Sequence, residues 1–196
     1  MRLHLIFKIF FLLTVMSGCT SNTNYNDEDL NIDRDDLSDT LVVEDNLNTP
    51  RESPYSFIAL GDSYTIGEGV NEDERWPNQF VDVAYENGVD FDQPMIIAET
   101  GWKTYDLLNA INQTNFTKKY DYISLLIGVN NQFNSRPIDE FEEDLNKLMD
   151  EMKRIKKNDG SIIIISIPDW GYTPFGESSD MSDISEQINL FNSSLR

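Results

Sequence analysis

The sequence of residues 55–196 predicts an α/β fold in which a parallel sheet carries helices on both faces. Two observations predict it: short apolar runs alternate with longer amphipathic stretches, and one run, 161–167 (SIIIISI), consists almost entirely of isoleucine. Alternating strands and helices are typical of parallel β/α units. A continuous β-branched run is typical of a parallel strand that is buried on both faces. The 196 residues suffice for one ordinary domain with a hydrophobic core.

The first half of this domain contains two expected strands and two expected helices. Residues 56–60 (SFIAL) and 95–98 (MIIA) are short apolar runs, as strands require. Residues 76–87 (WPNQFVDVAYEN) predict a helix that ends at Gly88, because glycine commonly follows a helix. Residues 102–111 predict a second helix, whose apolar side chains at helical spacing are Leu107, Leu108 and Ile111.

The second half continues the alternation. Residues 122–127 are expected to form a strand, and 161–167 another. Between them, 138–157 predict the clearest helix, because apolar residues recur in steps of three and four at Ile138, Phe141, Leu145, Leu148, Met152 and Ile155. This helix begins with acidic residues and ends with basic ones, which suits its dipole, and Gly160 follows as a stop. A last helix is expected from about Ser182.

The chain is strongly acidic. Lysine and arginine number 15 against 35 aspartates and glutamates, which gives a formal net charge of −20. Such a charge argues against nucleic acid or anionic lipid as an electrostatic partner. No sequence cluster of histidine, cysteine and carboxylates suggests a metal. We therefore expect no nucleic-acid partner, no metal and no cofactor, and we expect a monomer.

The first 18 residues are expected to be a lipoprotein signal peptide. Arg2 and Lys8 supply a positively charged start. The apolar stretch that follows, 9–16 (IFFLLTVM), is too short to span a bilayer comfortably. It runs into Met16-Ser17-Gly18-Cys19, and small residues followed by cysteine resemble the bacterial lipobox. Cys19 would then be acylated and would hold the protein on a membrane of the bacterial cell envelope, outside the cytoplasm. The alternatives are an ordinary cleaved signal or an uncleaved anchor, with Cys19 incidental.

Residues 19–54 are expected to form an acidic, disordered tether. Serine, asparagine, threonine and acidic residues dominate, without a helical or strand period. Low hydrophobicity combined with one-sided charge does not compensate the entropy lost on ordering. The predicted organisation is therefore a signal peptide at 1–18, a tether at 19–54 and a folded domain at 55–196.

Three polar stretches come directly after expected strands: Gly61-Asp62-Ser63, Glu99-Thr100-Gly101-Trp102 and Gly128-Val129-Asn130-Asn131. Ligands of parallel sheets bind beyond the carboxyl ends of the strands, so these stretches predict one site. Ser63 offers a hydroxyl nucleophile. The Gly101 N–H and the Asn130 side-chain amide offer donors to an oxyanion. Taken singly, each stretch is explained by a turn, and for the first two stretches a turn is the better explanation.

Taken together and in this order, the three stretches resemble the SGNH, or GDSL-type, hydrolase superfamily. Ser63 matches the nucleophile of its first block, Gly101 the glycine of its second, and Asn130 the asparagine of its third. Asn131 stands where that superfamily usually has aspartate. The segments GDSYTIGEGVNEDERWPNQF and IPDWGYTPFG also resemble one bacterial branch, and the resemblance covers about residues 56–196.

The resemblance implies a three-layer, flavodoxin-like α/β/α domain that hydrolyses carboxylic esters of small molecules or glycans. Ser63 would attack the acyl carbonyl, and the N–H groups of Ser63 and Gly101 with the Asn130 amide would bind the oxyanion. Asp62 is expected to hold the turn rather than to titrate. The loop 168–176 (PDWGYTPFG) would either wall an acyl pocket with Trp170, Tyr172 and Phe175 or be a plain aromatic-capped loop.

The base that the superfamily uses is not found in the domain. That base is a histidine in an Asp-x-x-His block, whereas the single histidine of this chain is His4. We therefore expect the last strand, the catalytic block and the closing helix to be missing. One interpretation is an envelope-anchored esterase that is truncated and inactive in this form. Another is a non-catalytic module that keeps the oxyanion pocket for an acyl or carbohydrate ligand, and a third is a remnant that does not fold.

Overall fold

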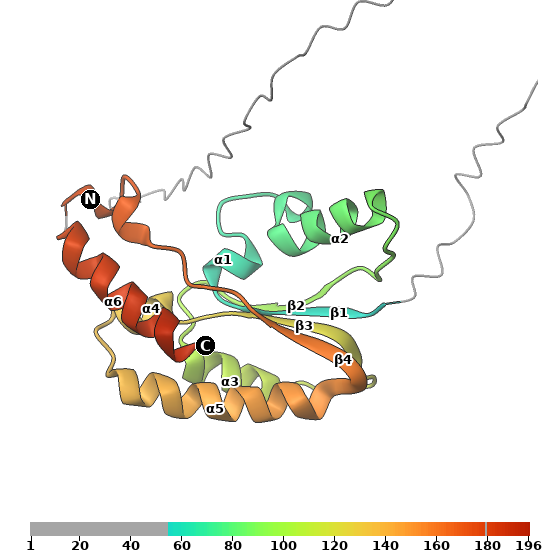
Figure 1. Cartoon of the computed structure of the whole chain (residues 1–196). Coiled ribbons are helices and arrows are strands. Elements are labelled where there is room, and N and C mark those ends of the chain that lie inside the picture. The colour runs from blue at the N-terminus through green and yellow to red at the C-terminus, as the bar shows by residue number, and fades with distance from the viewer. Residues whose placement is uncertain (1–54, 179) are drawn as a thin grey trace, which may run out of the picture. The chain divides into compact units, whose positions relative to one another are not determined.

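Residues 55–178 and 180–196 are described by the computed structural model (Figure 1). The expected signal peptide 1–18, Cys19 and the remainder of the expected tether 19–54 lie outside these residues. Within them, no helix combines the length and the apolar character that crossing a membrane requires.

Four parallel strands form the sheet of the described domain, in the order β2-β1-β3-β4. Their bounds are Phe57–Gly61 for β1, Met95–Ala98 for β2, Tyr120–Leu126 for β3 and Lys156–Ile164 for β4. Gly61, the last residue of β1, pairs with Ala98 of β2 on one side and with Leu126 of β3 on the other. The carboxyl ends of β1, β2 and β3 therefore lie side by side, which is what the predicted site requires.

Helices cover both faces of this sheet. Figure 1 shows α2 on one face and α3 and α5 on the other. The helices are α1 (Ser63–Ile66), α2 (Trp76–Glu86), α3 (Thr104–Gln113), α4 (Val129–Phe133), α5 (Ile138–Ile155) and α6 (Met181–Ser194). Short 3-10 turns lie at Glu72–Glu74, Trp170–Tyr172 and Gly176–Ser178. The predicted three-layer α/β fold with a parallel sheet is confirmed.

Helix α5 supplies one side of the core through the predicted apolar stripe. Phe141, Leu148 and Met152 are fully buried with strand residues such as Ile58 and Ile123. Acidic residues lie in its first turn and basic residues in its last turn, as the helix dipole favours. The helix ends at Ile155, two residues earlier than the expected Lys157, because Lys156 already pairs with Tyr120 as the first residue of β4.

Strand β4 corrects one prediction. The isoleucine run predicts a strand buried on both faces, but Ile163 is 38% exposed. Ile162 and Ile164 pack against the core, and Ile163 faces the opposite side. The reason is that β4 is an edge strand, which pairs only with β3 in the described sheet. The composition of a strand does not reveal which of its faces helices will cover.

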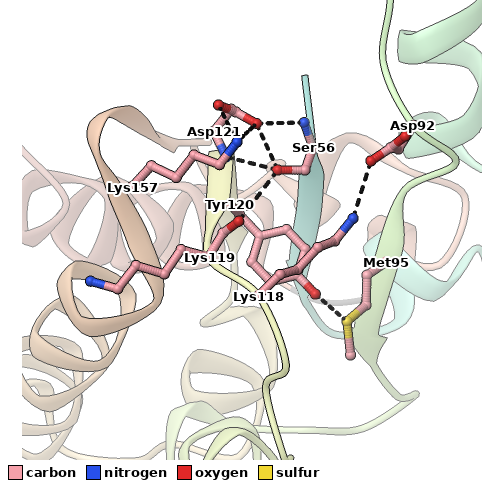
Figure 2. Close-up of polar contacts among 8 residues, drawn as sticks. All are labelled: Ser56, Asp92, Met95, Lys118, Lys119, Tyr120, Asp121 and Lys157. Atoms are coloured by element: carbon pink, nitrogen blue, oxygen red, sulfur yellow. Dashed lines mark hydrogen bonds and ion pairs between the residues drawn. The ribbon is translucent and has the colours of Figure 1, made fainter. Parts of the chain in front are cut away.

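A polar cluster ties three strands together at their amino ends (Figure 2). The backbone N–H and the hydroxyl of Ser56 each donate to Oδ2 of Asp121 at 2.7 Å. The Lys157 ammonium donates to both oxygens of the same carboxylate, at 2.9 and 2.8 Å. Burial raises the pKa of Asp121, but these hydrogen bonds outweigh it and lower the pKa to about 2. The cluster lies at the end of the sheet opposite to Ser63, so we interpret it as structural.

Candidate active site

The expected nucleophile Ser63 is the first residue of α1, directly beyond β1. Asp62 caps this helix: its Oδ1 accepts a hydrogen bond from the Tyr64 N–H at 3.1 Å. The helix is only four residues long and ends at Gly67. The turn presents the half-buried Ser63 at the carboxyl edge of the sheet. A carboxylate and a hydroxyl therefore follow β1 because Asp62 caps α1 and Ser63 is the first residue of that helix.

Asp62 is buried, with 1% of its surface exposed. Burial raises the pKa of this carboxyl to about 7, although the N–H groups of Tyr64, Gly128 and Asp62 itself lower it in part. Its Oδ2 finds no hydrogen-bond partner among residues 55–178 and 180–196. Asp62 therefore holds the turn, as expected, but it also titrates near neutral pH, contrary to expectation.

The second stretch follows β2. Gly101 has φ of 87°, a left-handed conformation that favours glycine, and nothing lies within 4 Å of the position that its Cβ would occupy. The space above this backbone is therefore open. The Thr100 hydroxyl donates a hydrogen bond to the carboxylate of Glu68, which follows α1. This contact fastens the second stretch to the segment that carries Ser63.

The third stretch follows β3 and begins α4. Gly128 has φ of 128°, and a Cβ there would lie 2.6 Å from Cδ1 of Ile167 and 2.8 Å from Cε2 of Phe141, so the turn requires glycine. Asn130, in the first turn of α4, donates from Nδ2 to the carbonyl oxygen of Trp102 at 2.9 Å. The second and third stretches are thus in direct contact.

Asn131, at the position where aspartate is usual, is a buried structural residue. Its Oδ1 accepts from the Thr104 N–H at 3.1 Å, and its Nδ2 donates to the Thr104 hydroxyl oxygen at 2.9 Å. That hydroxyl donates onward to Oδ2 of Asp144 at 3.1 Å. The amide therefore joins α4 to the start of α3 and, through Thr104, to α5.

The loop after β4 contributes an aromatic cluster. Trp170 donates from Nε1 to Oε1 of Gln132 at 2.7 Å, which attaches the loop to α4. The ring of Trp170 also contacts those of Phe133 and Phe175. Tyr172, in the same turn as Trp170, is 78% exposed. Of the three aromatic residues expected to wall an acyl pocket, Trp170 and Phe175 gather here, together with the unexpected Phe133.

The structure brings the three stretches of the predicted site together, and the roles of Ser63, Gly101 and Asn130 remain predictions. The sequence neighbours of Ser63 are the ionisable residues Asp62 and Tyr64. Burial, and then the carboxylates of Asp62 and Asp169, raise the pKa of Tyr64. The one histidine of the chain, His4, is outside the described residues. In the described part, no three histidine, cysteine or acidic side chains are placed to hold a metal ion.

Sequence reasoning missed two contributors to this site. Gln132 is nearly fully buried and connects α4 to the aromatic loop, and Asp144 accepts the Thr104 hydrogen bond. Gln132 carries no sequence signal, because a polar residue in an expected turn is normally assigned to the surface. Asp144 is one of many acidic residues of α5, and nothing in the sequence distinguishes it.

Comparisons with known proteins agree with this architecture. The model of the GDSL-like lipase/acylhydrolase family matches residues 59–196. A mutant of the esterase AlinE4 is 18% identical, with a TM-score of 0.55 over 75% of this chain and 72% of that chain. The acetyl xylan esterase AlAXEase is also 18% identical, with a TM-score of 0.55 over 71% of each chain. TesA is 13% identical, with a TM-score of 0.53 over 71% of this chain and 74% of that one. These likenesses show a shared fold, and no curated protein matches the sequence.

Proposed function

This chain belongs to the GDSL-like lipase/acylhydrolase family, and from that premise we propose that its domain hydrolyses carboxylic esters with Ser63 as the nucleophile. One observation carries the proposal. Ser63, Gly101 and Asn130 follow the carboxyl ends of three adjacent parallel strands, and the Asn130 amide contacts the residue next to Gly101. The Ser63 hydroxyl, the backbone N–H groups and the Asn130 amide therefore belong to segments that meet at the carboxyl ends of the strands.

The proposed chemistry follows from these groups. The Ser63 oxygen attacks the acyl carbon, its proton passes to a base, and the carbonyl oxygen becomes an oxyanion. The N–H groups of Ser63 and Gly101 donate to that oxygen. Asn130 uses one Nδ2 proton on the Trp102 carbonyl, and an amide nitrogen carries a second proton for the oxyanion. The alcohol departs with the proton, and water then hydrolyses the acyl-serine ester.

The base is the component that residues 55–196 do not supply, since the only histidine is His4. The neighbouring Asp62 is buried, and its Oδ1 is engaged by the Tyr64 N–H. A serine hydroxyl without a base stays protonated at neutral pH. In a serine protease, loss of the nucleophile or of the histidine alone costs about 10⁶ in turnover. We therefore propose near-background esterase activity for the chain as it stands.

Chemical rescue tests this function. Hydrolysis of p-nitrophenyl acetate is measured with and without added imidazole, and the rate of Ser63→Ala is subtracted to remove the reaction of imidazole itself. We expect a rescued rate that saturates with substrate and that Ser63→Ala lacks. Fusion of a segment carrying Asp-x-x-His is expected to restore activity in the same Ser63-dependent way. Equal rates in the wild type and Ser63→Ala under all these conditions would contradict the nucleophile assignment.

The alternative function is a non-catalytic binding module that keeps the donors of Gly101 and Asn130 and does not use Ser63 as a nucleophile. Such a module would bind an acyl or carbohydrate ligand in the oxyanion pocket without turning it over. It predicts saturable binding of a neutral ketone together with no Ser63-dependent hydrolysis, even with imidazole or a fused Asp-x-x-His segment.

The proposed location is the bacterial cell envelope, with the protein held by an acylated Cys19 alone. We propose that the substrate is a small-molecule or glycan ester and that the protein is a monomer. Cys19→Ser is expected to abolish labelling by a radioactive fatty acid and to release the protein from the membrane fraction. Unchanged labelling and retention in that variant would contradict the anchor.

A further inference from the structure

Glu68 connects the segment that carries Ser63 to the turn that carries Gly101. The chain turns back at Gly67 after α1, so the Glu68 N–H donates to the Ser63 carbonyl oxygen at 3.0 Å. The side-chain carboxylate of Glu68 accepts a hydrogen bond from the Thr100 hydroxyl, 32 positions away in the sequence. Through its backbone Glu68 contacts the proposed nucleophile, and through its side chain it contacts the residue before the proposed oxyanion donor.

Gly101 lies in a four-residue turn that no strand holds in place. Strand β2 ends at Ala98, and the turn is closed by a hydrogen bond from the Trp102 N–H to the Glu99 carbonyl oxygen at 3.3 Å. Gly101 is exposed, and among residues 55–178 and 180–196 its N–H donates no backbone hydrogen bond. This donor is therefore free for a ligand, but the pairing of the sheet does not fix its position.

Two side-chain hydrogen bonds from other segments hold this turn in the described structure, one on each side of Gly101. Asn130, from the third stretch, donates to the Trp102 carbonyl oxygen at 2.9 Å. Glu68 accepts from the Thr100 hydroxyl. Because Glu68 also contacts Ser63, its hydrogen bond is the one that relates the Gly101 turn to the nucleophile.

We infer that Glu68 is a positioning residue, which through Thr100 holds the Gly101 N–H at the distance from Ser63 that an oxyanion requires. The inference rests on the proposed ester hydrolysis. Oxyanion donors act at about 2.7–3.1 Å from the oxygen, and a misplacement of about 1 Å can cost about 10²-fold in rate. The contact of Glu68 with Thr100 is exposed, so its loss should alter catalysis much more than the midpoint of urea unfolding.

The first measurement is the NMR order parameter of the Gly101 amide, which does not depend on turnover. Selective nitrogen-15 labelling shows the ten glycines of the chain, and Gly101→Ala identifies the Gly101 signal by its loss. We expect the order parameter to fall from about 0.85 toward 0.6 in Glu68→Ala and Thr100→Val. Glu68→Gln keeps an acceptor and Thr100→Ser keeps a hydroxyl, so both should retain it. Gly88 is the internal control, because it is also exposed, with φ of 80° and open space at its Cβ position.

The second measurement is the imidazole-rescued, Ser63-dependent hydrolysis of p-nitrophenyl acetate. Glu68→Ala and Thr100→Val are expected to lower kcat by about 10- to 100-fold with KM nearly unchanged, because a donor to the transition state is misplaced. The double variant should be no slower than either single variant, since each removes the same contact. Glu142→Ala and Ser194→Ala are the matched controls. The Ser194 hydroxyl donates to the Glu142 carboxylate at 2.7 Å in another exposed contact, which joins α6 to α5, and its loss should leave kcat unchanged.

An unchanged Gly101 order parameter in both Glu68→Ala and Thr100→Val would overturn the inference. Additive losses of rate in the double variant would overturn it too, because the two side chains would then act separately. The same holds for a loss in Glu68→Gln as large as in Glu68→Ala, since charge and not the hydrogen bond would be responsible. A wild type without Ser63-dependent hydrolysis would overturn the proposed function instead, and the Gly101 amide would still decide whether Glu68 holds the turn.

Discussion

Asn131 holds Thr104 by two hydrogen bonds, accepting from its N–H at 3.1 Å and donating to its hydroxyl oxygen at 2.9 Å. This arrangement leaves the Thr104 proton free for Asp144. A carboxylate at position 131 has no proton to donate and would compete with Asp144 for that single proton. The amide at this position is therefore matched to the acidic residue on α5.

Asn131→Asp is accordingly expected to destabilise the protein by about 1–3 kcal/mol, because a buried polar group loses its donor. Adding Asp144→Asn should restore much of the loss, since an amide at position 144 removes the competing charge. The two single variants and the double variant are compared by urea denaturation as a double-mutant cycle. Strictly additive effects would show that positions 131 and 144 are not coupled.

Asn130→Ala removes both the link to Trp102 and the proposed oxyanion donor. We expect the imidazole-rescued, Ser63-dependent rate to fall by about 10²–10³. Asn134→Ala is the control, because Asn134 is exposed, follows the same helix and bonds only the Asn130 carbonyl through its Nδ2. A comparable loss of rate in both variants would indicate that the helix, and not the Asn130 amide, is responsible.

Asp62 makes stability depend on pH in an unusual direction. Its folded-state pKa is about 7, above the ordinary value of 3.8, so the folded protein binds the proton more tightly than the unfolded chain does. Stability contributed by the protonated carboxyl is complete below pH 3.8 and is lost as the pH rises through 7. Each pKa unit corresponds to about 1.4 kcal/mol. Asp62→Asn, which cannot ionise, is expected to remove this dependence.

The measurement is urea denaturation of wild type and Asp62→Asn at pH 5 and pH 8. The wild type should lose more free energy of unfolding between the two pH values than the variant, by about 2–3 kcal/mol. The other perturbed aspartate, Asp121, has a pKa of about 2 and does not titrate in this window. Parallel pH profiles in the two proteins would contradict the raised pKa.

The fold was predictable because its strongest signals are local. Helix α5 begins at the residue that its apolar period predicts, and β2 has the expected bounds. The length of β4 was not predictable, because Lys156–Gly160 carries no apolar pattern and becomes strand only by pairing beside β3. The exposure of Ile163 likewise depends on which helices cover the strand, and the sequence of the strand does not contain that information.

The candidate site was predictable in part for a similar reason. Parallel strands place their carboxyl ends together, so Ser63, Gly101 and Asn130 were assigned to one edge from order alone. The residues that hold these side chains in place were not predictable. The contact of Asn130 with Trp102 joins residues 28 positions apart, and the contact of Gln132 with Trp170 joins residues 38 positions apart. The raised pKa of Asp62 follows from burial, which a sequence pattern does not quantify.

Asp121 provides the last prediction, at the opposite end of the sheet. Its carboxylate accepts hydrogen bonds from Ser56 and Lys157, and its pKa of about 2 lies below the ordinary 3.8 (Figure 2). Stability contributed by this ionised group is present above pH 3.8 and is lost as the pH falls toward 2. Asp121→Asn is therefore expected to cost about 1–3 kcal/mol at pH 7 and progressively less in acid.

The control is Asp92→Asn, which breaks an ion pair with Lys118 that Figure 2 also shows. The Asp92 side chain is 45% exposed, against 13% for Asp121, so solvent screens it and its loss should cost at most about 1 kcal/mol. Urea denaturation at pH 7 and pH 3 distinguishes the two variants. The cost of Asp121→Asn should shrink at pH 3 because the wild-type carboxylate begins to be protonated in the unfolded chain and then in the folded protein. An undiminished cost at pH 3 would mean that Asp121 stabilises the strands by shape and not by charge.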